Sequence, residues 1–143
     1  MKLLIVNGPN LNLLGLREPE LYGRRTYADL IDFLSAAAEE LDVEIACYQS
    51  NHEGDLVDRI QTAYGQFDGI IINAAAYTHT SVALLDALKA VGLPAVEVHL
   101  TDPDRREEFR RVSYLRAACE TVIAGHGFEG YREAMAFLKE RHG

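Results

Sequence analysis

Short runs of β-branched and other apolar residues alternate along this chain with longer stretches in which apolar residues recur every three or four positions. The short runs predict five strands, at residues 3–6, 43–48, 69–72, 95–98 and 121–124. The longer stretches, which separate most of the strands and follow the last one, predict four helices. This alternation is typical of an α/β protein whose parallel sheet is covered by helices on both faces.

Each predicted helix carries one apolar stripe, which we expect to face the sheet. The first helix also has a capping-box-like start, Thr26-x-x-Asp29, and the third is closed by Gly92 and Pro94. The stripes consist of Leu30, Leu34, Ala37 and Leu41 in the first helix, of Leu56, Ile60 and Ala63 in the second, of Val82, Leu85 and Leu88 in the third, and of Phe128, Tyr131, Met135 and Leu138 in the last.

The commonest arrangement for five strands of this kind is a flavodoxin-like three-layer sandwich, with a five-stranded parallel sheet of order 2-1-3-4-5. Ligands of open α/β sheets bind outside the carboxyl ends of the strands, at the switch point between strands 1 and 3. The loops that follow Val6, Ile72 and Val98 are therefore the places where we expect the chemistry of the protein.

The composition limits the classes of partner. With 143 residues, of which 48% are hydrophobic, the chain is predicted to be a single domain spanning residues 1–143. Its formal net charge of −8 argues against binding to nucleic acid or to an anionic membrane, because both need a basic surface. No apolar run approaches the length of a membrane span, and no signal-peptide core is present at the start. Cys47 and Cys119 form no C-x-x-C motif and predict a reducing, cytoplasmic location.

The connection after the first strand is unusually long, running from Gly8 to Arg25 where two to six residues are usual. Loops of this length are often lids or binding loops. Arg17, Arg24 and Arg25 could bind an anion there, and nearby guanidinium groups would favour the phenolate form of Tyr22 as a base. A solvated basic loop anchored by the tyrosine ring is the alternative.

The loops after strands 3 and 4 offer further polar groups. Asn73 directly follows strand 3, and His79 comes a few residues later, close to a helix start that Thr78, Thr80 or Ser81 could cap. Glu97 and His99 lie two positions apart on strand 4 and therefore point to the same face of the sheet. A carboxylate beside an imidazole stabilises the imidazolium and suits a general acid, although a purely structural ion pair and a purely local role for His79 remain open.

The segment Gly125-His126-Gly127-Phe128-Glu129-Gly130 matches G-x-G-x-x-G literally, but no further strand follows it, so a tight turn explains the glycines better than a dinucleotide site. The histidines lack a local metal-ligand spacing, and no P-loop or nucleophile elbow occurs. The residues thus indicate metal-free acid–base chemistry on a small, oxygen-rich anion. The alternative is a non-catalytic flavodoxin-like module that binds a nucleotide or phosphate at residues 125–130.

Several blocks of the sequence, in order over nearly the whole chain, resemble type II 3-dehydroquinate dehydratase. The blocks are Asn7-Gly8-Pro9-Asn10-Leu11-Asn12-Leu13-Leu14-Gly15 through Arg17, Glu18, Pro19, Tyr22 and Gly23; Gln49-Ser50-Asn51-x-Glu53-Gly54; Tyr77-Thr78-His79-Thr80-Ser81-Val82-Ala83 through Asp86-Ala87; Glu97-Val98-His99-Leu100; Arg106-Glu107-Glu108-Phe109-Arg110; and Gly125-x-Gly127-x-x-Gly130-Tyr131. The resemblance implies trans elimination of water from 3-dehydroquinate to give 3-dehydroshikimate in the shikimate pathway, which leads to aromatic amino acids, with no metal, cofactor or imine.

The resemblance also implies roles in the reaction. Tyr22 would be the base that removes the proton α to the ketone, with Arg17 favouring its ionised form and closing with the loop. Asn10 and Asn73 would hold the enolate and an ordered water. His99, oriented by Glu97, would protonate the departing C1 hydroxyl.

Substrate contacts are implied as well. His79 and Arg110 would bind ring hydroxyls, and the backbone at Leu100 and Thr101 would bind the carboxylate. Asp86 would reach the site of a neighbouring subunit, in a homo-oligomer that is usually a dodecamer built from four trimers.

Two positions depart from the family pattern. Asn73 is usually followed there by Pro-Gly or Ala-Gly, whereas Ala74-Ala75 follows it here and reduces the backbone freedom. Asp102 stands where Asn is common, and its charge is expected to weaken binding of a carboxylate nearby.

Overall fold

The computed structural model describes residues 1–16 and 18–143, the side chains of residues 21 and 22 excepted. Its centre is a five-stranded parallel sheet of order β2-β1-β3-β4-β5, which confirms the predicted α/β class and strand order. The strands are β1 (Lys2–Asn7), β2 (Glu44–Gln49), β3 (Gly69–Asn73), β4 (Ala95–His99) and β5 (Thr121–Ala124). Each lies within a residue or two of its predicted position.

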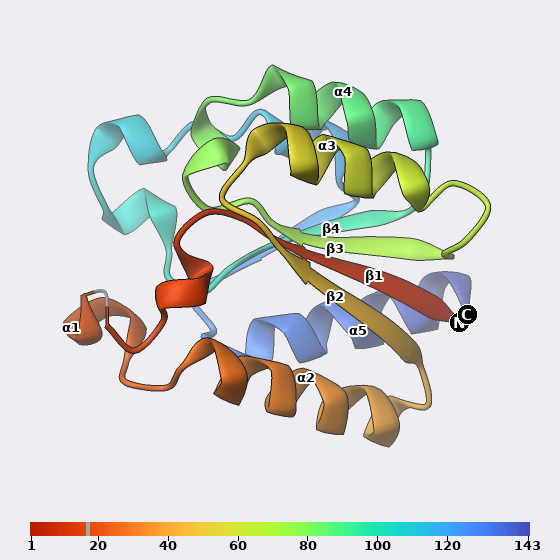
Figure 1. The fold of residues 1–143 in the computed structure, drawn as a ribbon, viewed down its shortest axis with the longest axis horizontal. Helices are drawn as coiled ribbons and strands as arrows, with labels where there is room; N and C mark the ends of the chain where they lie inside the picture. The colour runs from red at the N-terminus through yellow and green to blue at the C-terminus, as the bar shows by residue number, and fades with distance from the viewer. Residues whose placement is uncertain (17) are drawn as a thin grey trace.

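Helices cover both faces of the sheet (Figure 1). The long helices are α2 (Tyr27–Leu41), α3 (Glu53–Thr62), α4 (Val82–Val91) and α5 (Glu129–His142). On β1, Leu3 and Ile5 pack toward α2 and α5, whereas Leu4 and Val6 pack toward α3 and α4. All four side chains are fully buried, and burial of one such side chain contributes about 1.5–3 kcal/mol.

Local sequence explains where two of the helices begin, but not which face of α4 is buried. The capping box of α2 is present, since Thr26 Oγ1 accepts from the N–H of Asp29 at 3.1 Å and the Asp29 carboxylate accepts from the N–H of Thr26 at 2.8 Å. Ser81 caps α4 by accepting from the N–H of Leu84 at 3.0 Å. The predicted α4 stripe was wrong in part: Val82 is 49% exposed and Leu85 is only half-buried. The helix instead buries Leu84, Ala87 and Leu88, because α3 and the Leu115–Ala118 turn flank it as well as the sheet.

The long connection between β1 and α2 is not simply irregular. It contains a 3₁₀ turn, η1 (Leu11–Leu13), and a short helix, α1 (Pro19–Tyr22), neither of which the sequence pattern predicted. Its first residue, Gly8, lies so close to the loop after β3 that a Cβ atom there would be 2.3 Å from the carbonyl oxygen of Ala74. Glycine is therefore required at this point, and it brings the loops after β1 and β3 together at the carboxyl edge of the sheet.

Within the described residues, no helix combines the length and the apolar character needed to cross a membrane.

Candidate active site

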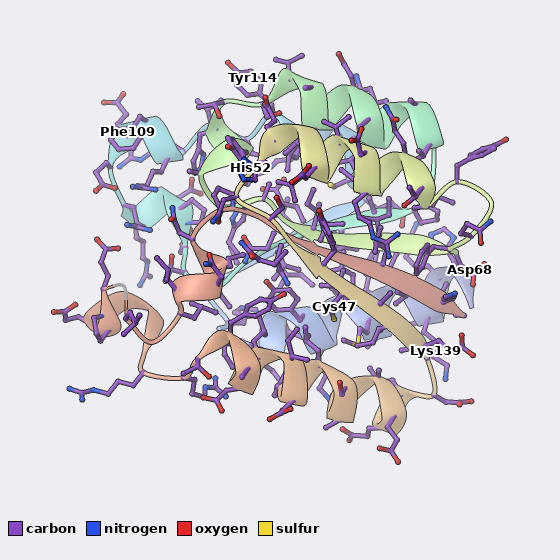
Figure 2. All side chains as sticks on the ribbon, viewed as in Figure 1. Cys47, His52, Asp68, Phe109, Tyr114 and Lys139 are labelled. Carbon is purple, nitrogen blue, oxygen red and sulfur yellow. The ribbon has the colours of Figure 1, made fainter. Side chains whose placement is uncertain are left out.

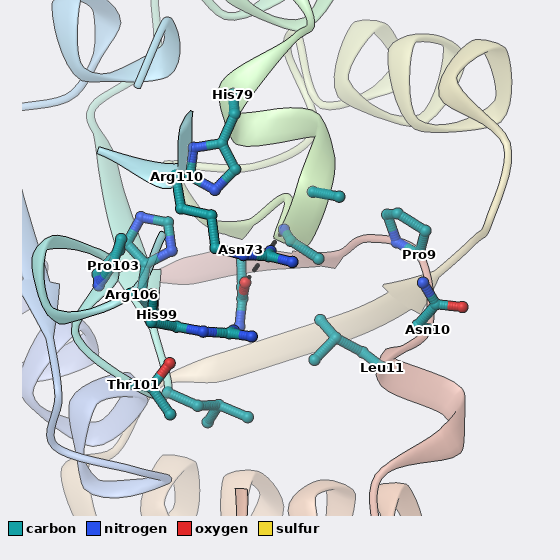
Figure 3. Close-up of a pocket in the computed structure, with 13 residues that line it drawn as sticks. Pro9, Asn10, Leu11, Asn73, His79, His99, Thr101, Pro103, Arg106 and Arg110 are labelled. Atoms are coloured by element: carbon teal, nitrogen blue, oxygen red, sulfur yellow. Dashed lines mark hydrogen bonds between the residues drawn. The ribbon is translucent and has the colours of Figure 1, made fainter. Parts of the chain in front are cut away.

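A pocket opens at the carboxyl edge of the sheet, between the loops that follow β1, β3 and β4 (Figure 3). The space between these loops is about 560 Å³, open solvent at its mouth included. Seven predicted site residues line it, namely Asn10, Asn73, His79, His99, Leu100, Thr101 and Arg110. The position expected from the topology of the sheet therefore agrees with the position of the pocket.

The buried pair Glu97 and His99 lies on the β4 side of the pocket. Both side chains leave the same face of the strand, as their two-residue spacing predicted, and Nε2 of His99 donates to Oε2 of Glu97. Glu97 is fully buried, and His99 is only 7% exposed. Because Nε2 is bound to the carboxylate, Nδ1 is the nitrogen that remains for the pocket, and it becomes a donor only in the imidazolium.

The Glu97 carboxylate has further partners that the sequence did not reveal. Its Oε1 accepts from the hydroxyl of Ser113 at 2.8 Å, and the Arg116 guanidinium lies 4.0 Å from Oε2. Burial alone raises the pKa of Glu97, but hydrogen bonds from His99 and Ser113 and the charges of His99 and Arg116 outweigh it, so the net pKa is lowered. The group is therefore held as a carboxylate, which is the form that stabilises an imidazolium.

Asn73 lies at the back of the pocket, at the end of β3. Its Oδ1 accepts from the backbone N–H of Ala75 at 3.2 Å, and its Nδ2 donates to the hydroxyl of Tyr131 at 3.0 Å. Ala75 adopts a left-handed conformation with φ of 52°, which non-glycine residues rarely adopt. The departure at residues 74–75 therefore has a structural consequence, since an alanine occupies a position suited to glycine.

Asn10 is presented by the loop after β1, across the pocket from His99 (Figure 3). It has a left-handed φ of 69°, a conformation that asparagine tolerates. Its backbone N–H donates to Oδ1 of Asn51 at 3.0 Å, and Nε2 of Gln49 donates to the carbonyl oxygen of Gly8 at 3.1 Å. The Gln49–Asn51 segment at the end of β2, which had no predicted role of its own, therefore fixes this loop.

His79, Arg106 and Arg110 also line the pocket. Nδ1 of His79 lies 2.6 Å from the carbonyl oxygen of Val112, so Nδ1 carries the proton and Nε2 is left for a ligand. Arg110 is held by Glu107, whose Oε2 accepts from Nε at 2.6 Å. Arg106 also lines the pocket and bonds Glu18 of the long loop at 3.2 Å. The sequence did not indicate a role of its own for Arg106, although it belongs to one of the blocks that carry the resemblance.

Other predicted site residues lie away from the pocket or outside the described part of the chain. Asp86 is exposed on α4 and does not line the pocket. Arg17 and the side chain of Tyr22 lie outside the described residues, and only the backbone of Tyr22, in α1, is described. Of the two interpretations of Arg24 and Arg25, the structure gives no support to anion binding: neither lines the pocket, and the guanidinium of Arg25 stacks 3.8 Å from the centre of the Phe128 ring.

Asp102 does not line the pocket either, although its neighbours Thr101 and Pro103 do. Its Oδ1 accepts from the N–H of Asp104 at 3.0 Å, which caps the following 3₁₀ turn. The carboxylate is therefore directed to the backbone of its own turn.

The glycine-rich segment after β5 is a turn. Gly125 and Gly127 have φ of 82° and 59°, and their N–H groups donate to the carbonyl oxygens of His99 and Leu100. Because these two backbone N–H groups already donate to carbonyl oxygens of the protein, they are not available to bind a phosphate. The nucleotide-binding alternative has no support at this turn.

A flavodoxin-like sheet with a buried carboxylate–imidazole pair, two amides and arginines at its carboxyl edge defines a small α/β enzyme of the acid–base type. The comparisons with known proteins agree with this class. The sequence model described as Dehydroquinase class II matches residues 1–139, and the chain belongs to that family.

The chain is 55% identical over 131 residues to a 3-dehydroquinate dehydratase from Geotalea daltonii, covering 92% of this chain and 91% of the relative. A type II dehydroquinase structure from Butyrivibrio crossotus has a TM-score of 0.95 at 45% identity, with 97% of each chain covered. One from Propionibacterium acnes has a TM-score of 0.93 at 37% identity, covering 97% of this chain and 96% of the other.

Proposed function

We propose that this enzyme, a hydro-lyase of the type II dehydroquinase family, eliminates water from 3-dehydroquinate by the steps below. The observation that carries the mechanism is the meeting of the buried Glu97–His99 pair with Asn73 and Asn10 in one pocket. One group there can protonate a leaving oxygen, and the others can bind a developing enolate. These are the two requirements of an elimination next to a ketone.

In the first step, Tyr22 removes the proton α to the ketone and the electron pair moves onto the carbonyl oxygen, giving an enolate. Arg17 favours the phenolate form of Tyr22. Asn73 and Asn10 bind the enolate and an ordered water. The remaining N–H of the Asn73 amide supports this role, because its Oδ1 and the other N–H are already bonded.

In the second step, the enolate collapses, the C1–O bond breaks and His99 transfers its proton to the leaving hydroxyl, which departs as water. Glu97 stabilises the imidazolium and fixes the ring orientation. The lowered pKa of Glu97 and its three partners support this assignment.

The substrate is oriented by the other groups of the pocket. Nε2 of His79 and the guanidinium of Arg110 bind ring hydroxyls, and the backbone at Leu100 and Thr101 binds the carboxylate. The two arginines of the pocket supply guanidinium N–H donors, and each is also held by a glutamate, Arg106 by Glu18 and Arg110 by Glu107. Such donors bind the oxygens of a small substrate.

The direct test is to mix the purified protein with 3-dehydroquinate and follow the ultraviolet absorbance of the conjugated enone-carboxylate product. The absorbance should rise, and EDTA should not reduce the rate.

Tyr22→Phe should abolish most of the turnover while the circular dichroism spectrum is unchanged, because the change deletes one oxygen atom. Turnover close to the unaltered protein in that variant would refute the role of Tyr22.

We further propose that residues 1–143 form one catalytic domain that assembles in the cytoplasm as a dodecamer of four trimers, with Asp86 reaching a neighbouring site. The exposed apolar side chains of Val82, the first residue of α4, and of Phe109 and Tyr114, in the segment after β4 (Figure 2), support contacts with another subunit. Sedimentation equilibrium should give about twelve times the subunit mass of 15.9 kDa. Phe109→Asp should shift the protein to smaller species, and a monomer in both samples would refute the assembly.

A further inference from the structure

The strand ends of β1 and β3 are joined by a buried chain of polar groups beneath the pocket. The hydroxyl of Tyr131, on α5, donates to Oδ1 of Asn7 at 2.6 Å and accepts from Nδ2 of Asn73 at 3.0 Å. Nδ2 of Asn7 lies a further 3.4 Å from the hydroxyl of Tyr27. Tyr131 and Asn7 are fully buried and Asn73 is 3% exposed. Of the four residues joined by these hydrogen bonds, only Asn73 lines the pocket.

This arrangement follows from the pleat of the sheet. Asn7 and Asn73 are paired neighbours in the parallel ladder, and they continue the faces of Ile5 and Ile71 that pack toward α2 and α5. Gly130 allows the start of α5 to approach the sheet closely, since a Cβ atom there would be 3.3 Å from the Ile123 side chain. The Gly130–Tyr131 pair, to which the proposed reaction gives no role, therefore has a geometric purpose.

These hydrogen bonds also determine which way the Asn73 amide is oriented. Tyr131 uses its only proton on Asn7, so toward Asn73 its oxygen can only accept. That requires Nδ2 of Asn73 to point to Tyr131 and leaves its Oδ1 for the N–H of Ala75. The group that Asn73 then has left for the pocket is the second N–H of Nδ2, which is a donor. A flipped amide would present an acceptor, which would repel an enolate.

We propose that Tyr131 is a positioning residue for the dehydration: through its hydrogen bonds to Asn7 and Asn73 it holds the Asn73 amide with an N–H toward the enolate oxygen. The inference rests on the proposed role of Asn73. Burial raises the pKa of the Tyr131 hydroxyl, so it keeps its proton throughout the working range and the direction of the chain does not change with pH.

The test compares Tyr131→Phe with Tyr48→Phe, measuring kcat, KM and the unfolding temperature. Tyr48→Phe removes the same atom from a half-buried tyrosine of β2 whose ring packs toward α3, on the other face of the sheet. Tyr131→Phe should lower kcat by about 10- to 100-fold, the scale of a misplaced reacting group, with KM within about twofold. The control should retain both constants. An unchanged kcat in folded Tyr131→Phe, or equal losses in both variants, would overturn the inference.

A merely structural role is distinguished by combining Tyr131→Phe with Asn73→Ala. If Tyr131 acts through Asn73, adding its substitution to Asn73→Ala lowers the unfolding temperature further but leaves kcat where Asn73→Ala had put it. If the two losses in kcat multiply, the inference fails. Should Tyr131→Phe not fold, Asn7→Ala probes the same chain, because it removes the acceptor of the tyrosine proton, and the same dependence on Asn73 is expected.

The outcomes also separate the inference from the function on which it rests. Absence of turnover in the unaltered enzyme would refute the proposed function. Full kcat in Asn73→Ala would refute the role of Asn73, and with it the inference, while the function stands. A low kcat in Asn73→Ala beside an unchanged kcat in Tyr131→Phe would refute the positioning role alone.

Discussion

The Glu97–His99 pair permits a quantitative prediction, because glutamine can replace the glutamate without changing its shape. In Glu97→Gln the amide oxygen can accept from Nε2 of His99 and the amide nitrogen can donate to the hydroxyl of Ser113. Only the negative charge is lost. Since both hydrogen bonds can be kept, we expect the urea midpoint to change little, and the effect on rate can be measured on a folded protein.

The size of the effect follows from the contacts of the carboxylate. A hydrogen bond to a charged group is worth about 1.5–3 kcal/mol and a neutral one about 0.5–1.5 kcal/mol, so Glu97→Gln removes roughly 1–1.5 kcal/mol of support for the imidazolium. Arg116 changes this little, because its side chain is 52% exposed and such pairs contribute about 0–1 kcal/mol. This loss means roughly 5- to 10-fold lower kcat, since 1.4 kcal/mol corresponds to a factor of ten.

The assay is kcat and KM of the folded variant beside those of the unaltered enzyme. The loss should appear in kcat with KM little changed, because Glu97 is fully buried and does not line the pocket. The matched control is Glu133→Gln, which makes the same change in an exposed pair whose carboxylate lies 2.6 Å from Nδ1 of His126. Its kcat should be unchanged. An unchanged kcat in folded Glu97→Gln, or an equal loss in the control, would refute the assignment of His99 as the acid supported by this charge.

Three further predictions concern the strained loop, the thiols and the substrate contacts. Ala75→Gly should raise the free energy of unfolding by about 0.5–1 kcal/mol in urea titrations. The left-handed φ of 52° costs alanine about 1–2 kcal/mol, and the greater conformational entropy of glycine in the unfolded chain offsets part of that gain. An unchanged or lower urea midpoint would contradict this prediction. Burial raises the pKa of Cys47 to about 11 and that of Cys119 to about 12. Both thiols are neutral in the folded protein, and their contribution to stability is fully present below the unfolded pKa of about 8.5. That contribution should be lost as the pH rises from there toward 11–12. Maleimide labelling of the folded protein at pH 8 should be much slower than labelling in denaturant, and equal rates would argue against burial. His79→Ala should raise KM about 2- to 10-fold with a smaller change in kcat, since it removes one hydrogen-bonding partner of the substrate, worth about 0.5–1.5 kcal/mol. A fall in kcat alone would assign His79 to the chemistry.

The sequence could predict those features that depend on residues close together in the chain. The alternation of elements gave the sheet order, and the two-residue spacing of Glu97 and His99 placed both on one face of β4. The capping box at Thr26 could likewise be predicted, because its partner Asp29 lies three residues further along the sequence. Each of these predictions is confirmed by the structure.

The features that the sequence did not reveal depend on contacts between distant residues or on the surroundings of a helix. Ser113 reaches Glu97 from a loop 16 residues later, and Tyr131 reaches Asn7 across 124 residues. No periodicity relates such positions. Val82 was expected in the apolar stripe of α4 but is exposed, because α3 flanks the helix and shifts the buried face to Leu84 and its neighbours.

The two sides of the sheet contribute different halves of the proposed chemistry. Glu97 and His99 leave β4 toward the layer of α3 and α4, since their neighbours Val96 and Val98 pack toward α2 and α5. Asn73 leaves β3 toward the opposite layer, where Tyr131 holds it. The acid and the enolate donor are therefore supported by separate layers and meet only beyond the strand ends, where a substrate ring can lie between them. This separation suits the proposed elimination, because His99 must reach the hydroxyl that leaves C1 while the Asn73 amide reaches the enolate oxygen, which lies on a different carbon of the ring.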